Sequence, residues 1–202
     1  MSIYRNFGSY FRRHLGMAVL LVFAVAFAEF GFLHADATFA DPDSFYHTQM
    51  AVRLARHGLV TDFPWLAQTV LGDAYIDHHL LYHVLLIPFV TLLPPLAGVK
   101  LATVLFAALA VATFHWLLRR LEVRPAWLYT GVLLVSNPFL FRIGLAKAQA
   151  LSLVVLLVLV WLVIQRRTLA AAALSFAYVW LYGGWPLAGV VVAAYVLAGV
   201  PT

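Results

Sequence analysis

Carboxylates and an imidazole stand close together early in the chain, in the run Asp41-Pro42-Asp43-Ser44-Phe45-Tyr46-His47. A carboxylate in such a run can deprotonate or orient a reacting group, and a nearby cation can stabilise an anion as it departs. Asp43, supported by Asp41, is therefore the candidate catalytic group, and Tyr46 and His47 are candidate pocket residues. The alternative for Asp43 is structural, because an aspartate at the start of a helix often caps backbone N–H groups.

A second group of ionisable side chains starts at Asp77 and continues with His78, His79 and His83. His79 and His83 are four residues apart, so a helix would place both imidazoles on one face, as a pair of divalent-metal ligands requires. Asp77 or Asp43 would supply a third ligand, and His78 would belong to the same pocket. The alternative is local hydrogen bonding at the level of the lipid headgroups, since the glutamate of a HExxH motif is missing.

Three basic residues are candidates to lie on the same side of the membrane as these aspartates. Arg53 follows the acidic run, and Arg142 and Lys147 flank a later turn. Each is a candidate for binding an anionic group at the membrane surface, because a cation stabilises an anion as it departs. The alternative for Arg142 and Lys147 is that they reach toward water from the ends of two membrane helices.

The chain around these residues has the composition of an integral membrane protein. Of its 202 residues, 64% are hydrophobic and only 10% are charged, which is too little charge for the surface of a soluble domain. The 13 lysines and arginines are scattered between apolar runs and form no stripe, so the net charge of +5 does not indicate a nucleic-acid partner. The absence of cysteine excludes disulfides, thiol catalysis and thiolate-bound metals.

Apolar segments predict an all-α membrane protein of about six transmembrane helices in a single domain, residues 1–202. The first segment is longer than a signal-peptide core, and we expect it to be retained as a helix. The six predicted spans are 15–33, 101–118, 127–141, 148–164, 169–182 and 185–200.

The first two spans are separated by a large loop, residues 34–99, which holds every aspartate of the chain. Two amphipathic or re-entrant helices are expected within this loop. The first covers 44–57, where Tyr46 begins a four-residue apolar repeat and Gly58 marks the end. The second covers 78–93 and is shorter than the roughly 20 residues that a spanning helix needs.

Basic residues predict the orientation of the chain. The N-terminal flank with Arg5, Arg12 and Arg13 and the arginine pairs at 119–120 and 166–167 are expected in the cytoplasm, following the positive-inside tendency. The acidic loop is then extracytoplasmic, on the outer side of a plasma or inner membrane.

Three short motifs give the chain a resemblance to a known family. The first is Asp43-Ser44-Phe45-Tyr46-His47, followed by Arg53 and His57-Gly58, which resembles the first-loop motif of oligosaccharyltransferase catalytic subunits. The second, Asn137 through Arg142, resembles the outer end of their third span. The third, Trp180 through Trp185, resembles their Trp-Gly-Gly-aromatic turn. These subunits belong to the GT-C class of integral-membrane glycosyltransferases.

The resemblance implies transfer of a sugar or glycan from a polyprenyl-phosphate donor to an acceptor at the extracytoplasmic side. The implied partners are the lipid-linked sugar donor and membrane lipid, and the candidates for binding the donor phosphate are Arg53, Arg142 and Lys147. The implied cofactor is a divalent cation, magnesium or manganese. The chain departs from the family at Lys147-Ala148-Gln149, where a second acidic pair usually helps to hold that cation. Family members are also longer, so we expect a fragment, a split subunit or a reduced relative; for a split subunit, a second chain would supply the missing helices.

Two other classes of function remain open from the sequence. A non-catalytic GT-C-like subunit of a membrane complex would keep the fold without the chemistry. An ion-coupled transporter would use Glu29, Asp77 and the histidines near it as a proton or cation path, because intramembrane ionisable groups often line such paths.

Overall fold

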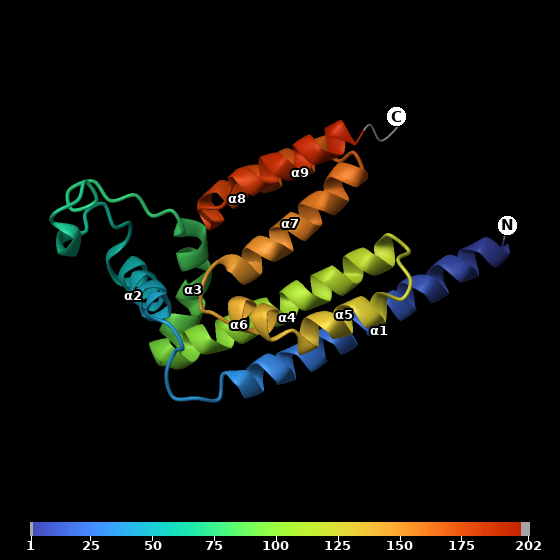
Figure 1. Ribbon diagram of the computed structural model, residues 1–202, viewed down its shortest axis with the longest axis horizontal. Coiled ribbons are helices and arrows are strands. Elements are labelled where there is room, and N and C mark those ends of the chain that lie inside the picture. Colours follow the sequence, from blue (N-terminus) through green and yellow to red (C-terminus); the bar gives the residue numbers. More distant parts are fainter. Residues whose placement is uncertain (1, 199–202) are drawn as a thin grey trace.

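The computed structural model describes the backbone of residues 2–198 and the side chains of 15–64 and 66–198. The side chains of Arg5, Arg12 and Arg13 lie outside these ranges. Within the described backbone, every regular element is a helix (Figure 1). The helices are α1 Ser2–Leu33, α2 Pro42–His57, a 3₁₀ turn η1 Pro64–Leu66, α3 Leu80–Leu92, α4 Pro95–Arg120, α5 Ala126–Val135, α6 Asn137–Ile143, α7 Gln149–Ile164, α8 Thr168–Leu181 and α9 Pro186–Leu197.

Two described helices are long and apolar enough to cross a membrane, Leu15–Leu33 of α1 and the whole of α4. These confirm the first two predicted spans. The pair α5 and α6 would add a third span if the two helices together make one crossing. Helices α3, α7, α8 and α9 are apolar but shorter; at 1.5 Å per residue, the 16 residues of α7 extend about 24 Å. Within the described residues the all-α fold is therefore confirmed and two candidate membrane spans are present, and the number of spans stays a prediction.

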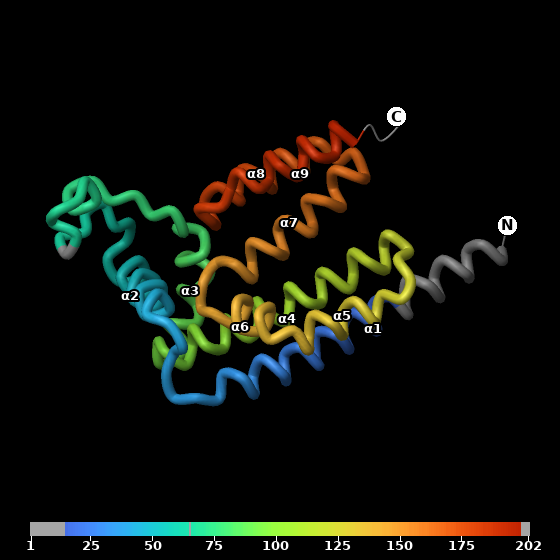
Figure 2. Tube along the Cα trace, viewed as in Figure 1, coloured from blue at the N-terminus to red at the C-terminus, as the bar shows by residue number. Residues whose placement is uncertain are grey.

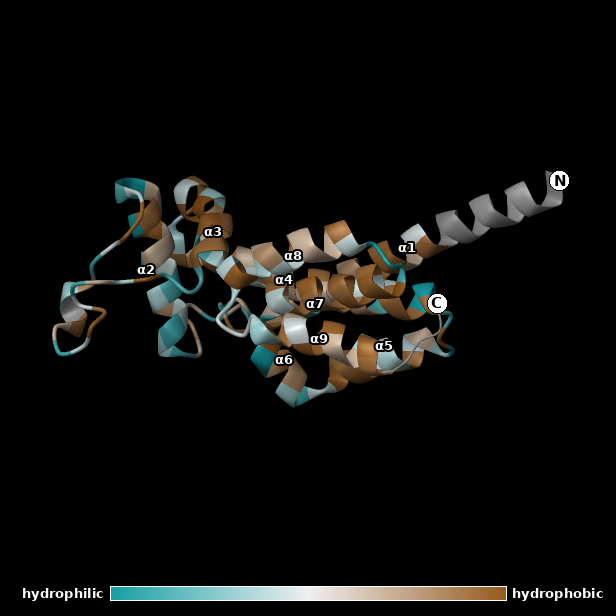
Figure 3. Cartoon of the chain, turned by 90° about the horizontal axis from the view of Figure 1, so that it is seen from above, coloured by the Kyte–Doolittle hydropathy of each residue, from teal (hydrophilic) through white to brown (hydrophobic). Residues whose placement is uncertain are grey.

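Helix α4 is the centre of the packing and contacts α1, α3, α5 and α7. Hydrophobic residues predominate along α4, α7 and α8, as the brown ribbons show (Figure 3). Small side chains allow helices to approach closely inside a bilayer, where van der Waals packing replaces the hydrophobic effect. The buried face of α4 is accordingly rich in alanine: Ala102, Ala107, Ala108, Ala110 and Ala112.

The predicted third span is broken, contrary to the expectation of one continuous segment at 127–141. Helix α5 ends before Ser136 and α6 starts at Asn137, with a bend of 75° between their axes. Pro138 occupies the first turn of α6. A proline lacks a backbone N–H and its ring clashes with the carbonyl four residues earlier, which favours a break between α5 and α6 at this position.

The aspartates lie at one end of the bundle together with Lys100 and Lys147, and the arginines at the ends of α4 and α7 lie at the other end. At one end, Lys100 at the start of α4 donates hydrogen bonds to the carbonyls of His34 and Asp36, just after α1. At the other end, the Arg120 guanidinium lies 5.8 Å from the ring centres of both Trp116 and Trp161. Helices α2 and α3 and the segment between them extend from the first end (Figure 2).

Candidate functional site

Helix α2 begins at Asp41, whose side chain caps it. One carboxylate oxygen accepts a hydrogen bond from the Asp43 backbone N–H at 3.0 Å, and the other accepts one from the Ser44 hydroxyl at 2.6 Å. The capping interpretation of Asp43 is therefore wrong, since Asp43 lies inside the first turn and its carboxylate stays available. The helix ends at Gly58 as predicted, and its φ of 79° explains why glycine is found there.

Lys147, in the turn between α6 and α7, joins the two acids. Its Nζ lies 2.7 Å from Asp43 Oδ2 and 3.1 Å from Asp41 Oδ1. The side chains of Lys147 and Asp41 are 15% and 14% exposed, whereas that of Asp43 is 66% exposed. The ammonium thus fixes the position of Asp43 while most of its carboxylate faces outward.

This contact also sets the charge states of Asp41 and Lys147. Partial burial alone would raise the pKa of Asp41, but hydrogen bonds from Ser44 and Lys147 outweigh it, and the pKa lies below its ordinary value. Burial alone would lower the pKa of Lys147, but the two carboxylates raise it above its ordinary value. The pair formed by Asp41 and Lys147 is therefore charged at neutral pH.

A chain of hydrogen bonds joins α2 to α3 beside these acids. The Asp77 carboxylate accepts from His83 Nδ1–H at 2.6 Å, and His83 Nε2 lies 2.8 Å from His47 Nδ1. Where His83 Nε2 accepts this hydrogen bond, His47 donates it from Nδ1 and keeps its own Nε2 as an acceptor. Asp77 also accepts a hydrogen bond from the His79 backbone N–H at 2.9 Å, which fixes the backbone just before α3.

Burial controls the ionisation of this chain. Burial, with smaller contributions from His83 and His79, lowers the pKa of His47 to about 3. Burial also lowers the pKa of His79. Burial alone would raise the pKa of Asp77, but the hydrogen bonds and charge interactions with His83 and His79 together outweigh it, and the pKa lies below its ordinary value. At neutral pH the chain thus holds a carboxylate and neutral His47 and His79 rings.

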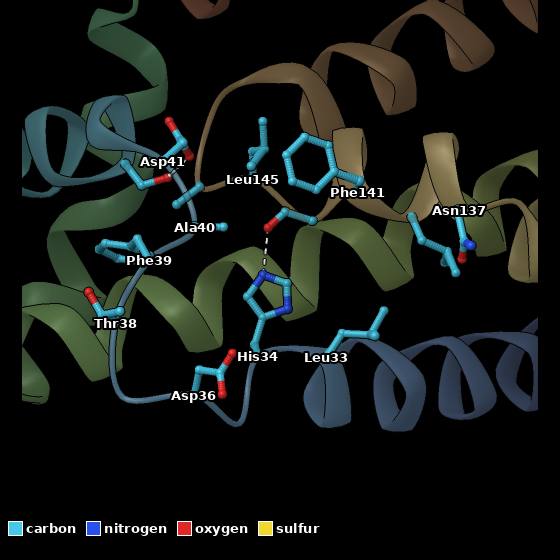
Figure 4. Close-up of a pocket in the computed structure, with 14 residues that line it drawn as sticks. Leu33, His34, Asp36, Thr38, Phe39, Ala40, Asp41, Asn137, Phe141 and Leu145 are labelled. Carbon is cyan, nitrogen blue, oxygen red and sulfur yellow. Dashed lines mark hydrogen bonds between the residues drawn. The ribbon is translucent and has the colours of Figure 1, made fainter.

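A cavity of ≈ 460 Å³ opens next to Asp41, between the segment after α1 and helix α6 (Figure 4). Its walls are partly apolar, with Phe39 and Phe141 among them, and partly polar, with Asp41, His34 and Asn137. The His34 ring hydrogen-bonds to the Gly144 carbonyl and so ties the end of α1 to the turn after α6. The cavity therefore combines apolar and polar walls beside the acidic helix start.

Other predicted site residues lie outside this cavity. Arg142 is exposed on α6 and is not part of the lining. Arg53 lines a separate hollow of ≈ 340 Å³ on α2 together with Tyr46. The Tyr46 hydroxyl hydrogen-bonds to that of Tyr75, and His78 is exposed. The structure thus brings Asp41, Asp43 and Lys147 together, and separately His47, Asp77, His79 and His83.

His34 and Phe39 line the cavity but were not singled out in the sequence, and Asn137 and Phe141 were noted there only as part of a motif, not as site residues. Phe39 and His34 stand a few residues before the acidic run, so their nearness to Asp41 along the chain was the available signal. Nothing in local spacing indicated that α6 would form the opposite wall, because that contact depends on the break at Ser136.

The described residues do not form a ready-made coordination site for a divalent cation. No group of three histidine, aspartate or glutamate side chains there is arranged to hold a metal. The Lys147 ammonium already lies against both Asp41 and Asp43, and both ring nitrogens of His83 are hydrogen-bonded. The residues in this arrangement do not fit magnesium or manganese, and the cation implied by the resemblance stays an untested prediction.

Comparisons with protein-family models, with curated proteins and with solved structures find no match for this chain.

Proposed function

We propose that this chain is a membrane glycosyltransferase of the GT-C type, which transfers a sugar or glycan from a polyprenyl-phosphate donor to an acceptor at the extracytoplasmic side. The observation that carries the proposal is the Asp43 carboxylate, which is 66% exposed, held at 2.7 Å by Lys147, and located beside a cavity that Asp41 lines. A fixed but accessible carboxylate is what an acceptor needs for deprotonation or orientation.

The character of the cavity supports a lipid-borne donor. It begins at Leu33, the last residue of a candidate membrane span, and extends to Asp41. Phe39, Leu140 and Phe141 offer apolar surface to the first part of a prenyl chain, and polar groups lie at the other side. An amphiphile at this position would present its sugar near Asp43.

In the proposed reaction, an acceptor O–H or N–H group attacks the anomeric carbon of the donor. The bond between that carbon and the phosphate oxygen breaks, and its electron pair leaves with the polyprenyl phosphate. The acceptor proton passes to the Asp43 carboxylate. Lys147 orients Asp43, since its ammonium is already engaged by carboxylates. Arg142, exposed on α6 next to the lining residue Phe141, is the proposed phosphate partner.

The test is a transfer assay with purified full-length chain, radiolabelled polyprenyl-phosphate sugars and a mixed panel of acceptors. Asp43→Asn should lower transfer by about 10²-fold or more, the usual contribution of a general base. Asp73→Asn, which removes an exposed aspartate of the same loop, should keep full activity.

Equal transfer by Asp43→Asn and the unsubstituted chain would remove this assignment. Uptake of protons or cations into proteoliposomes, combined with no transfer at all, would instead favour the transporter.

A further inference from the structure

A second cavity lies at the end of the bundle opposite Asp43, between α7, α8 and α9. Its volume is ≈ 520 Å³, within the range of roughly 300–1,000 Å³ that small-molecule sites occupy. Arg166, Arg167 and Thr168 line it where α7 turns into α8. The rest of its wall is mainly apolar: Val163, Ala171, Ala172, Val192 and Val196.

The turn places two arginines side by side at this cavity. Arg166 has a φ of 54°, a left-handed conformation that lets the chain reverse within a few residues. The backbone N–H groups of Arg166 and Arg167 donate to the carbonyls of Val163 and Leu162, at 3.0 and 2.9 Å, which fixes the turn. Both arginines are exposed. The cavity is therefore an apolar groove with a cationic rim, which Arg166 and Arg167 form.

The surrounding charge has the same sign. The last turn of α4 contributes Arg119 and Arg120, and the segment after it contributes Arg124 and a single acid, Glu122. Grouped arginines raise the local potential and attract anions from the membrane surface. An apolar groove that meets a cationic rim is complementary to a molecule with a hydrocarbon chain and an anionic head.

We propose that this groove binds one anionic phospholipid from the leaflet at the arginine end of the bundle. Its acyl chain lies along Ala172 and Val192, and its phosphate lies at Arg167 with Arg166 beside it. This lipid site is separate from the Asp43 cavity and does not depend on the proposed transfer reaction.

The test uses the full-length chain in detergent, with phosphatidylglycerol or phosphatidylcholine of identical acyl chains added, and counts retained lipid by native mass spectrometry. Both headgroups carry a phosphate, but only phosphatidylcholine also carries a cation, which opposes Arg167. We therefore expect about five-fold stronger retention of phosphatidylglycerol, the effect of roughly one arginine near a lipid with net negative charge. Arg167→Gln should abolish that preference. Arg124→Gln is the matched control, because it removes the same charge at the same end but does not line the groove.

A second pair of variants tests the groove itself. Ala172→Phe fills the groove and should reduce retention of either lipid, whereas Ala173→Phe, at an exposed position outside the lining, should not. The proposal is overturned if phosphatidylglycerol shows no preference, or if Arg124→Gln reduces the preference as much as Arg167→Gln. It is also overturned if the groove is occupied by a second copy of the chain, seen as a dimer that Ala172→Phe dissociates and lipid does not.

Discussion

The contact of Lys147 with two carboxylates orders the site more than it stabilises the protein. Exposed ion pairs contribute about 0–1 kcal/mol, and Asp43 is 66% exposed. The more buried contact is with Asp41, which already caps α2. The consequence of the bridge is therefore geometric: the turn after α6 is held against the start of α2, and the outward side of Asp43 stays accessible.

Residue-level ionisation gives a prediction for the stability of the protein in acid. Burial keeps His47 neutral by lowering its pKa from 6.5 to about 3 in the folded protein. Between these values the unfolded chain binds a proton that the folded chain does not, so the free energy of unfolding falls as pH drops below about 6.5. The thermal unfolding midpoint in detergent should therefore decline between pH 6.5 and pH 4.5.

The slope of this decline, rather than the midpoint itself, identifies His47. His47→Leu also loses the hydrogen bond to His83 and should unfold at a lower temperature at every pH, but its midpoint should depend less on pH in this window. His57→Leu removes an exposed histidine at the end of the same helix and should keep the original slope. A His47→Leu slope equal to that of the unsubstituted protein would contradict the buried neutral imidazole.

Sequence patterns identified the members of the site but not their pairing. Asp43 and Lys147 are 104 positions apart, and His47 and His83 are 36 apart, so their contacts depend on tertiary packing. The i, i+4 spacing of His79 and His83 suggested a metal pair. Both ring nitrogens of His83 are instead hydrogen-bonded to Asp77 and His47. Spacing along one helix carries no information about partners on another.

At the level of elements, the close approach of α3 and α4 depends on Gly98. A Cβ at this position would lie 2.2 Å from the Phe89 carbonyl oxygen and 2.7 Å from its carbon, both backbone atoms that cannot rotate away. Gly98→Ala should therefore separate the two helices and destabilise the protein by about 1–3 kcal/mol, as overpacking usually does. Thermal unfolding of the purified chain in detergent measures the effect.

Gly131→Ala is the matched control for this substitution. Gly131 lies inside α5, and a Cβ there would meet nothing within 4 Å. Alanine is favoured over glycine in a helix by about 1 kcal/mol, so this variant should be neutral or more stable. If both variants unfold at the same temperature, α3 and α4 do not approach as closely as described.

Local signals explain which helix ends were predictable. Gly58 ends α2 because its positive φ suits glycine. The start of α2 was expected at Ser44 but occurs at Pro42, since Asp41 rather than Asp43 is the cap. The break at Ser136 had a local signal in Pro138, but the apolar run continued past it. Hydropathy alone therefore joined α5 and α6 into one segment.

At the scale of the whole molecule, the separation of charge links the fold to a membrane orientation. The aspartates of α2 and the Asp77 segment lie at the end where α1 stops, and the arginines of the α4 and α7 termini lie at the other end (Figure 1). Basic residues tend to remain in the cytoplasm during insertion. The Asp43 site is then expected outside, and the proposed lipid site inside.

Because the chain contains no cysteine, single introduced cysteines can test this orientation without background. Val70→Cys lies in the loop after α2, where the native side chain is 84% exposed, and Gln165→Cys lies beside the arginine pair. A membrane-impermeant maleimide should label position 70 in intact cells, and position 165 only after the membrane is permeabilised.

Labelling of both positions in intact cells would place the acids and the arginines in one compartment. The Asp43 site would then not be confined to the outer side of the membrane, where the donor is proposed to bind. This result would contradict the orientation on which the transferase proposal depends.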